Sequence, residues 1–135
     1  MIGLDIKTYL STVGGFQDIS VNYVSETKSN AISIMETGGN TPVRPHGIKT
    51  ETEVIQNQID RPTFQIILRR SDKPTAEQDI KIIRGLLDGI TLQDINGTRY
   101  ISVIQTATAA YLGKVRTDEG DSNEYSLNFE AQIKL

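Results

Sequence analysis

The residues best suited to chemistry in this 135-residue chain are one histidine and one acidic run. His46 lies in a proline-rich stretch and has no second histidine with which to build a metal site. Carboxylates such as those of Asp118, Glu119, Asp121 and Glu124 are the ligands that calcium and magnesium prefer. Their spacing, however, does not match an EF-hand loop. We therefore interpret His46 as a loop residue near a subunit contact and the acidic run as a solvated loop.

Other catalytic patterns are missing from the sequence. There is no cysteine, which rules out disulfides, thiolate zinc sites and cysteine nucleophiles. The stretch Gly38-Gly39-Asn40-Thr41 lacks the Gly-Lys-Ser/Thr ending of a phosphate-binding loop, so we interpret it as a turn. Catalysis by paired carboxylates stays open, but no predicted helix places two of them at a telling spacing. We predict no catalytic, cofactor-binding or metal site, and we expect a protein that is not an enzyme.

Composition narrows the class of protein. The net charge is −3 and 23% of residues are charged, which disfavours broad attraction to phosphate backbones. No stretch approaches the roughly 20 apolar residues that span a bilayer, and Asp5 and Lys7 interrupt any secretory apolar run. We expect a protein made in the cytoplasm, with no membrane partner. With 37% hydrophobic residues, the chain is long enough for one domain covering residues 1–135.

Two segments carry apolar residues at helical spacing. The first ends at Gly14-Gly15, and the second begins near Asp72 or Pro74 and ends at Gly89. The apolar positions are Ile2, Ile6, Tyr9, Leu10 and Val13 in the first segment, and Ala76, Ile80, Ile83 and Leu87 in the second.

Several further segments predict strands. Apolar runs at 31–35 and 64–68 and the strict alternation at 125–133 are typical of strands, and 19–23 is a possible short one. Asn96-Gly97 between apolar runs predicts a hairpin. Residues 40–62 hold three prolines and predict a long projecting arm, and 106–122 a loop. The predicted fold is therefore α+β: a mixed, largely antiparallel sheet of four to five strands, with two helices packed on one face.

The order of these elements resembles the tail-terminator (minor capsid) proteins of siphophages over most of the chain. The segments that carry the resemblance are the N-terminal helix, NAISIMETGGN, PTFQIILRRS followed by PTAEQDIKIIRGLLDG, the ING hairpin, ATAAYLGKVRTDE and YSLNFEAQIKL. The resemblance implies a ring, typically a hexamer, on the head-proximal end of the virion tail. Such a ring stops polymerisation of the tail tube protein and offers a joining surface to the head-tail connector or stopper. DNA passes through its lumen without specific binding.

The family has no active site to transfer, so the residue-level expectations concern contacts between subunits or with partners. Arginine suits contacts with acidic surfaces, although surface arginines are as often ordinary solvated charge. The predicted interface residues are Arg44, Pro45, His46, Arg61, Arg69, Arg70, Leu112, Gly113 and Lys114. A head-completion protein that binds the connector is the nearest alternative function. A small ligand-binding module is a second one.

Overall fold

The computed structural model describes residues 2–43 and 59–134 of the protein. Within these residues it contains two helices and six strands, so the α+β class is confirmed but the expected four to five strands are too few. The helices are α1 (Ile2–Thr12) and α3 (Lys73–Leu87). The strands are β1 (Ile19–Val21), β2 (Ala31–Val43), β3 (Ile59–Arg70), β4 (Ile90–Ile95), β5 (Thr98–Thr117) and β6 (Gly120–Lys134).

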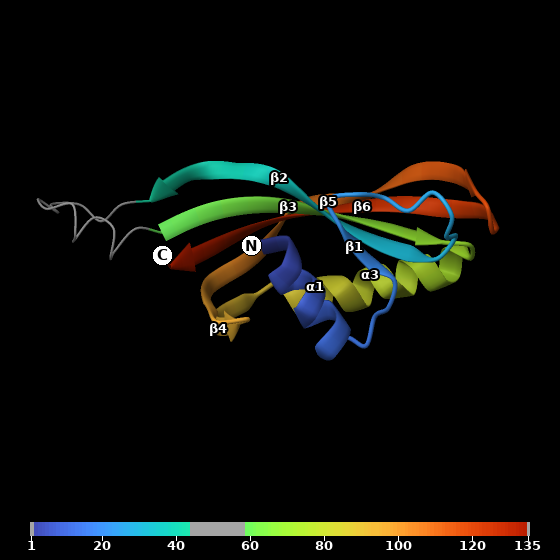
Figure 1. Ribbon diagram of the computed structural model, residues 1–135. Helices are drawn as coiled ribbons and strands as arrows, with labels where there is room; N and C mark the ends of the chain where they lie inside the picture. The colour runs from blue at the N-terminus through green and yellow to red at the C-terminus, as the bar shows by residue number, and fades with distance from the viewer. Residues whose placement is uncertain (1, 44–58, 135) are drawn as a thin grey trace, which may run out of the picture.

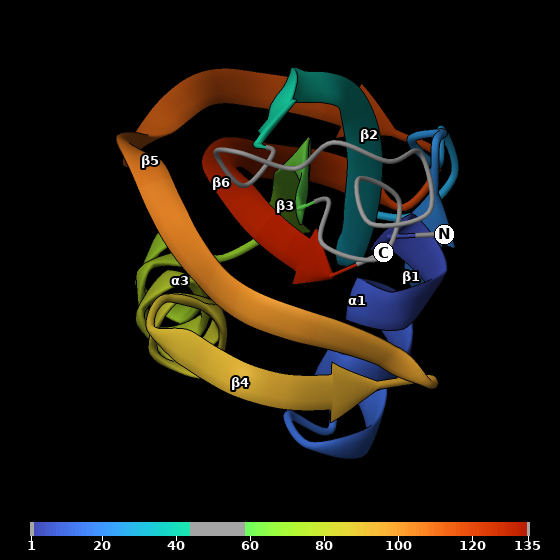
Figure 2. The same cartoon turned by 90° about the vertical axis from the view of Figure 1, so that its left-hand side faces the viewer.

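The strands form one curled sheet with the order β1-β2-β3-β6-β5-β4. Only β1 and β2 pair in parallel, and every other neighbouring pair is antiparallel, as the prediction of a mixed and largely antiparallel sheet requires. The long strand β5 bends, so that its first half and β4 turn under the rest of the sheet (Figure 2). Both helices lie on the concave side of this curl (Figures 1 and 2).

The core fills the space between the two helices and the concave face. Ile6 and Leu10 of α1 and Ile83 and Leu87 of α3 are fully buried, because the helical spacing places them on one side. From the sheet, the alternating positions of β3 and β6 point the same way, and all five predicted inward residues of β6 are buried. These five residues are Tyr125, Leu127, Phe129, Ala131 and Ile133.

Local sequence signals explain where the elements begin and end. Asp72 caps α3, since its carboxylate accepts a hydrogen bond from the Thr75 amide at 3.2 Å, and Pro74 occupies the first turn. The β4–β5 hairpin turns at Asn96 and Gly97, which have φ values of 51° and 78°. Positive φ at both central positions is what a type I′ turn needs, and this hairpin prediction is confirmed.

The loop predicted at residues 106–122 is wrong for most of its length. Residues 98–117 form one strand, and the turn between Thr117 and Gly120 connects it to β6. The prediction failed because residues 104–116 are exposed or half-buried on both faces, which removes the alternation that identifies a strand. Three register shifts against β6, between Gln105 and Gly113, disturb this alternation further.

The predicted arm at 40–62 is also shorter than expected. Residues 40–43 continue β2 and residues 59–62 begin β3, and the two segments pair with each other through bulges. Arg44, Pro45 and His46 lie outside the described residues. The expectation of a projecting arm therefore stays a prediction for residues 44–58 alone.

Candidate subunit interface

Within residues 2–43 and 59–134, one side of β5 has no neighbouring strand over its second half. Strand β4 pairs with β5 only as far as Val103, whereas β6 pairs with the other side as far as Thr117. The segment 106–110 reads Thr-Ala-Thr-Ala-Ala, and all of its side chains are small. We call residues 106–110 the β5 edge. Small side chains leave the N–H and C=O groups of an edge strand accessible, and such groups are able to pair with another chain.

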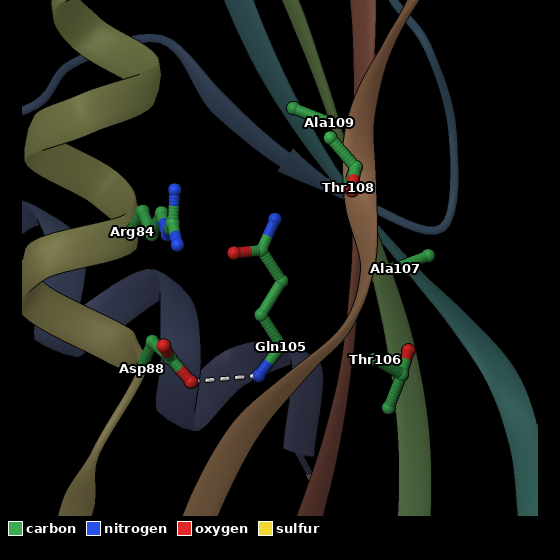
Figure 3. A pocket seen from close by; sticks show the side chains of 7 residues that line it. All are labelled: Arg84, Asp88, Gln105, Thr106, Ala107, Thr108 and Ala109. Atoms are coloured by element: carbon green, nitrogen blue, oxygen red, sulfur yellow. Dashed lines mark hydrogen bonds between the residues drawn. The ribbon is translucent and has the colours of Figure 1, made fainter.

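A cleft of about 340 Å³ separates the β5 edge from the end of α3. Its lining residues are Arg84, Asp88, Gln105, Thr106, Ala107, Thr108 and Ala109. The Asp88 carboxylate accepts a hydrogen bond from the Gln105 amide at 2.9 Å, which ends the β4–β5 pairing (Figure 3). Arg84 stands on the helix wall opposite β5 (Figure 3). The ion pairs among the described residues do not include Arg84. The Arg84 guanidinium therefore lies across the cleft from the β5 strand.

The opposite side of the sheet has a second free edge. Strand β1 pairs with β2 only at Ile32–Ile34, and the Asn22 side chain then accepts a hydrogen bond from the Glu36 amide at 2.9 Å. Residues 37–39, Thr-Gly-Gly, follow, and all three are exposed. Among the strands that the structure describes, they have only β3 as a neighbour, on one side. We call residues 37–39 the β2 edge. The two glycines again leave the backbone accessible, and Gly38 has a φ of 92°.

The surroundings of the β2 edge are acidic. A depression of about 420 Å³ reaches Gly38, and its three ionisable lining residues are all carboxylates. These are Asp5, Glu36 and Asp60. Asp5 and Glu36 already accept hydrogen bonds, from the Tyr100 hydroxyl at 2.6 Å and from the Gly3 amide at 3.0 Å. The electrostatic field of these carboxylates still reaches a second chain that approaches the β2 edge, because it extends over roughly a Debye length of 8–10 Å.

Arg69 and Arg70, two of the predicted interface residues, make their contacts within the subunit. Arg69 is 8% exposed, and its Nε donates to Glu124 at 2.8 Å while its guanidinium also reaches the Ser25 carbonyl. Arg70 forms an ion pair with Asp79 at 2.6 Å, which ties β3 to α3. Both guanidinium groups therefore already have partners, and their role at an interface stays a prediction.

The remaining predicted interface residues differ in exposure. Arg61 forms an ion pair with Glu130 at 2.7 Å and keeps 32% of its side chain exposed. Leu112, Gly113 and Lys114 lie in β5 beyond the β5 edge, and Leu112 is 51% exposed. Gly113 has a φ of 112°, a conformation that favours glycine. As contacts with another subunit, these residues stay predictions.

Tyr111 is a positioning residue that the sequence did not reveal. Its ring lies 5.0 Å from the ring of Tyr125, its hydroxyl donates to the Asn123 side chain at 3.1 Å, and the Lys73 ammonium sits 4.4 Å from its centroid. These contacts hold the second half of β5 against β6 and the start of α3. No local pattern signals such a role, because Asn123 and Tyr125 are brought to Tyr111 by the register of the β5–β6 hairpin, and Lys73 lies in α3.

Tyr100 is an ionisable residue whose role is structural. Burial raises the pKa of Tyr100, and the hydrogen bond from its hydroxyl to Asp5 raises it further. This pair ties β5 to α1 inside the core. Within residues 2–43 and 59–134, no group of three or more metal-ligating side chains comes together. No helix in the same ranges is long and apolar enough to cross a membrane.

Comparisons with known proteins give one family and one fold. The sequence model of a family described as bacteriophage tail terminator protein matches residues 9–135. A solved structure with 14% sequence identity covers 97% of this chain and 93% of its own, with a TM-score of 0.51. At that identity the likeness concerns the fold alone. Among curated proteins, none matches the chain.

Proposed function

Because this chain belongs to the bacteriophage tail terminator family, we propose that it assembles as a ring on the head-proximal end of the tail tube. The ring, a hexamer, stops polymerisation of the tube protein and presents the surface that the head connector or stopper joins. The observation that carries the proposal is the family match over residues 9–135. The family is one of structural phage proteins, and the function proposed is assembly within the virion, without catalysis.

The shape of the subunit is compatible with ring formation. A closed ring needs two different surfaces on each subunit, one meeting the other on the next copy. The β5 edge and the β2 edge lie on opposite sides of one sheet, and the ionisable side chains beside them differ. We also propose Leu112, Gly113 and Lys114, which continue β5 beyond its edge, as contact residues.

The charge of the chain suits a ring through which DNA slides. A net charge of −3 gives the subunit no general attraction for phosphates. Strong attraction would oppose passage of the genome. We therefore propose that DNA crosses the lumen without specific binding.

The deciding experiment is polymerisation of the cognate tail tube protein with and without this chain at substoichiometric amounts, followed by electron microscopy. We expect shorter tubes that carry a ring at one end only. Purified connector protein added afterwards should bind the capped end and leave uncapped ends bare. Normal uncapped tubes, with the chain free in solution or bound to the connector alone, would reject the terminator function in favour of head completion.

A further inference from the structure

The β5 edge and the β2 edge match each other in strand direction, in side-chain size and in charge. We propose that the β5 edge of one subunit pairs antiparallel with the β2 edge of a second copy, through a short ladder of backbone hydrogen bonds. This inference rests on the proposed ring, and it names the surfaces that build it.

Strand direction favours this pairing. Strands β2, β3, β6 and β5 alternate in direction, and their number is even. Strand β5 therefore runs opposite to β2. A neighbour placed beside β5, with its sheet in the same sense, offers its β2 antiparallel to β5. Each added copy continues the alternation, as a head-to-tail assembly needs.

Side-chain size favours it as well. Edge strands are normally protected from pairing by long charged side chains. Residues 106–110 and 37–39 carry none, because they consist of threonine, alanine and glycine alone. Register shifts in both strands keep the pairing short, since a bulged edge cannot support a long ladder.

Charge gives the contact its direction. Arg84 and Asp88 both line the cleft beside the β5 edge, and the exposed Lys81 lies one turn before Arg84 on α3. The Asp88 carboxylate already accepts a hydrogen bond from the Gln105 amide, and the two cations outnumber it. The depression beside the β2 edge contributes Asp5, Glu36 and Asp60. A basic side meets an acidic side in the head-to-tail arrangement. A two-fold contact between two β5 edges would lack this attraction to the three carboxylates beside the β2 edge.

The absence of native cysteine allows a direct test by disulfide formation. Thr108→Cys marks the β5 edge and Thr37→Cys marks the β2 edge, and both positions are exposed. The full-length double variant should, on mild oxidation after assembly, give a ladder of covalent oligomers on a non-reducing gel. The two single variants mixed together should stop at a dimer that contains one copy of each. A double variant of Thr91→Cys and Thr12→Cys, two exposed threonines elsewhere, serves as the control and should give no ladder.

The other outcomes are equally informative. Dimers from Thr108→Cys alone would overturn the head-to-tail pairing in favour of a two-fold contact. Rings that cap tubes normally, yet form no cross-link even with a short bismaleimide, would overturn the inference and leave the proposed function intact. A chain that neither assembles nor caps tubes would overturn both.

A charge reversal gives a second test that needs no cross-link. Arg84→Glu should weaken ring assembly by at least about tenfold, measured as the concentration needed for half-maximal tube capping. Lys7→Glu changes the net charge equally at an exposed position on α1 and should leave that concentration unchanged. Equal effects of the two variants would show that net charge acts alone, which would overturn the directed contact.

Discussion

Strands β5 and β6 are neighbours in one hairpin, yet they differ in how many strands flank them and in how many of their side chains are buried. Strand β6 has a strand on each side and a buried residue at nearly every second position. In the part of the chain that the structure describes, the second half of β5 has one neighbouring strand and little burial on either face. The same backbone pairing therefore serves two purposes. In β6 it completes the core, and in β5 it supports a strand whose other side has no partner among the described strands beyond Val103.

The largest expected difference lies in the core. Phe129 of β6 stacks on Phe64 of β3 with centroids 5.3 Å apart, and it is 1% exposed. Phe129→Ala should lower the free energy of unfolding by about 3–5 kcal/mol, because it removes buried apolar area and leaves a cavity. Denaturant unfolding measures the change. A loss below about 1 kcal/mol would show that the core between β3 and β6 is less tightly packed than described.

Ion pairs should show the next difference. Arg69→Ala removes a pair whose side chains are 10% and 18% exposed, and it leaves Glu124 without this partner. We expect a loss of about 2–3 kcal/mol in unfolding free energy. Arg99→Ala is the matched control, because its pair with Asp94 is 47% and 66% exposed and should contribute less than about 1 kcal/mol. Equal losses would contradict a protected β3–β6 pair.

The buried tyrosine predicts a dependence on pH. Tyr100→Phe should cost about 1–2 kcal/mol near neutral pH, because it leaves the Asp5 carboxylate without its hydroxyl partner. The pKa of Tyr100 is raised in the folded state, so the unfolded chain loses this proton first. Stability is then complete below about pH 10 and falls as the pH rises above it. Thermal melts from about pH 8 to about pH 11 should fall less steeply for Tyr100→Phe. Parallel slopes would contradict this assignment.

The smallest effect on stability is expected in the exposed half of β5. Leu112→Ser should change the free energy of unfolding by less than about 0.5 kcal/mol, since Leu112 is 51% exposed. The same variant should reduce tube capping if Leu112 contributes to the ring. Unchanged capping would remove Leu112 from the interface. A large loss of stability would instead show that this half of β5 supports the fold.

The elements that bury a regular stripe of side chains were predictable. The spacing of Ile6 and Leu10, the alternation in β6 and the turn at Asn96-Gly97 each depend on residues close in the sequence, and each is confirmed. The contacts of Arg69 were not predictable in this way. Its partners, Glu124 and Ser25, lie far from it in the chain, and only the folded sheet brings the three together.

The sequence by itself determined the two helices, the strands with one buried face and the family. Only the tertiary structure decided that residues 106–117 are a strand and that a sixth strand exists. It also decided that, within residues 2–43 and 59–134, the sheet keeps a free edge on each side. The physical reason is that periodicity records the burial of side chains. A strand held by backbone hydrogen bonds to one neighbour, with both faces open, buries too little to leave a period in the sequence.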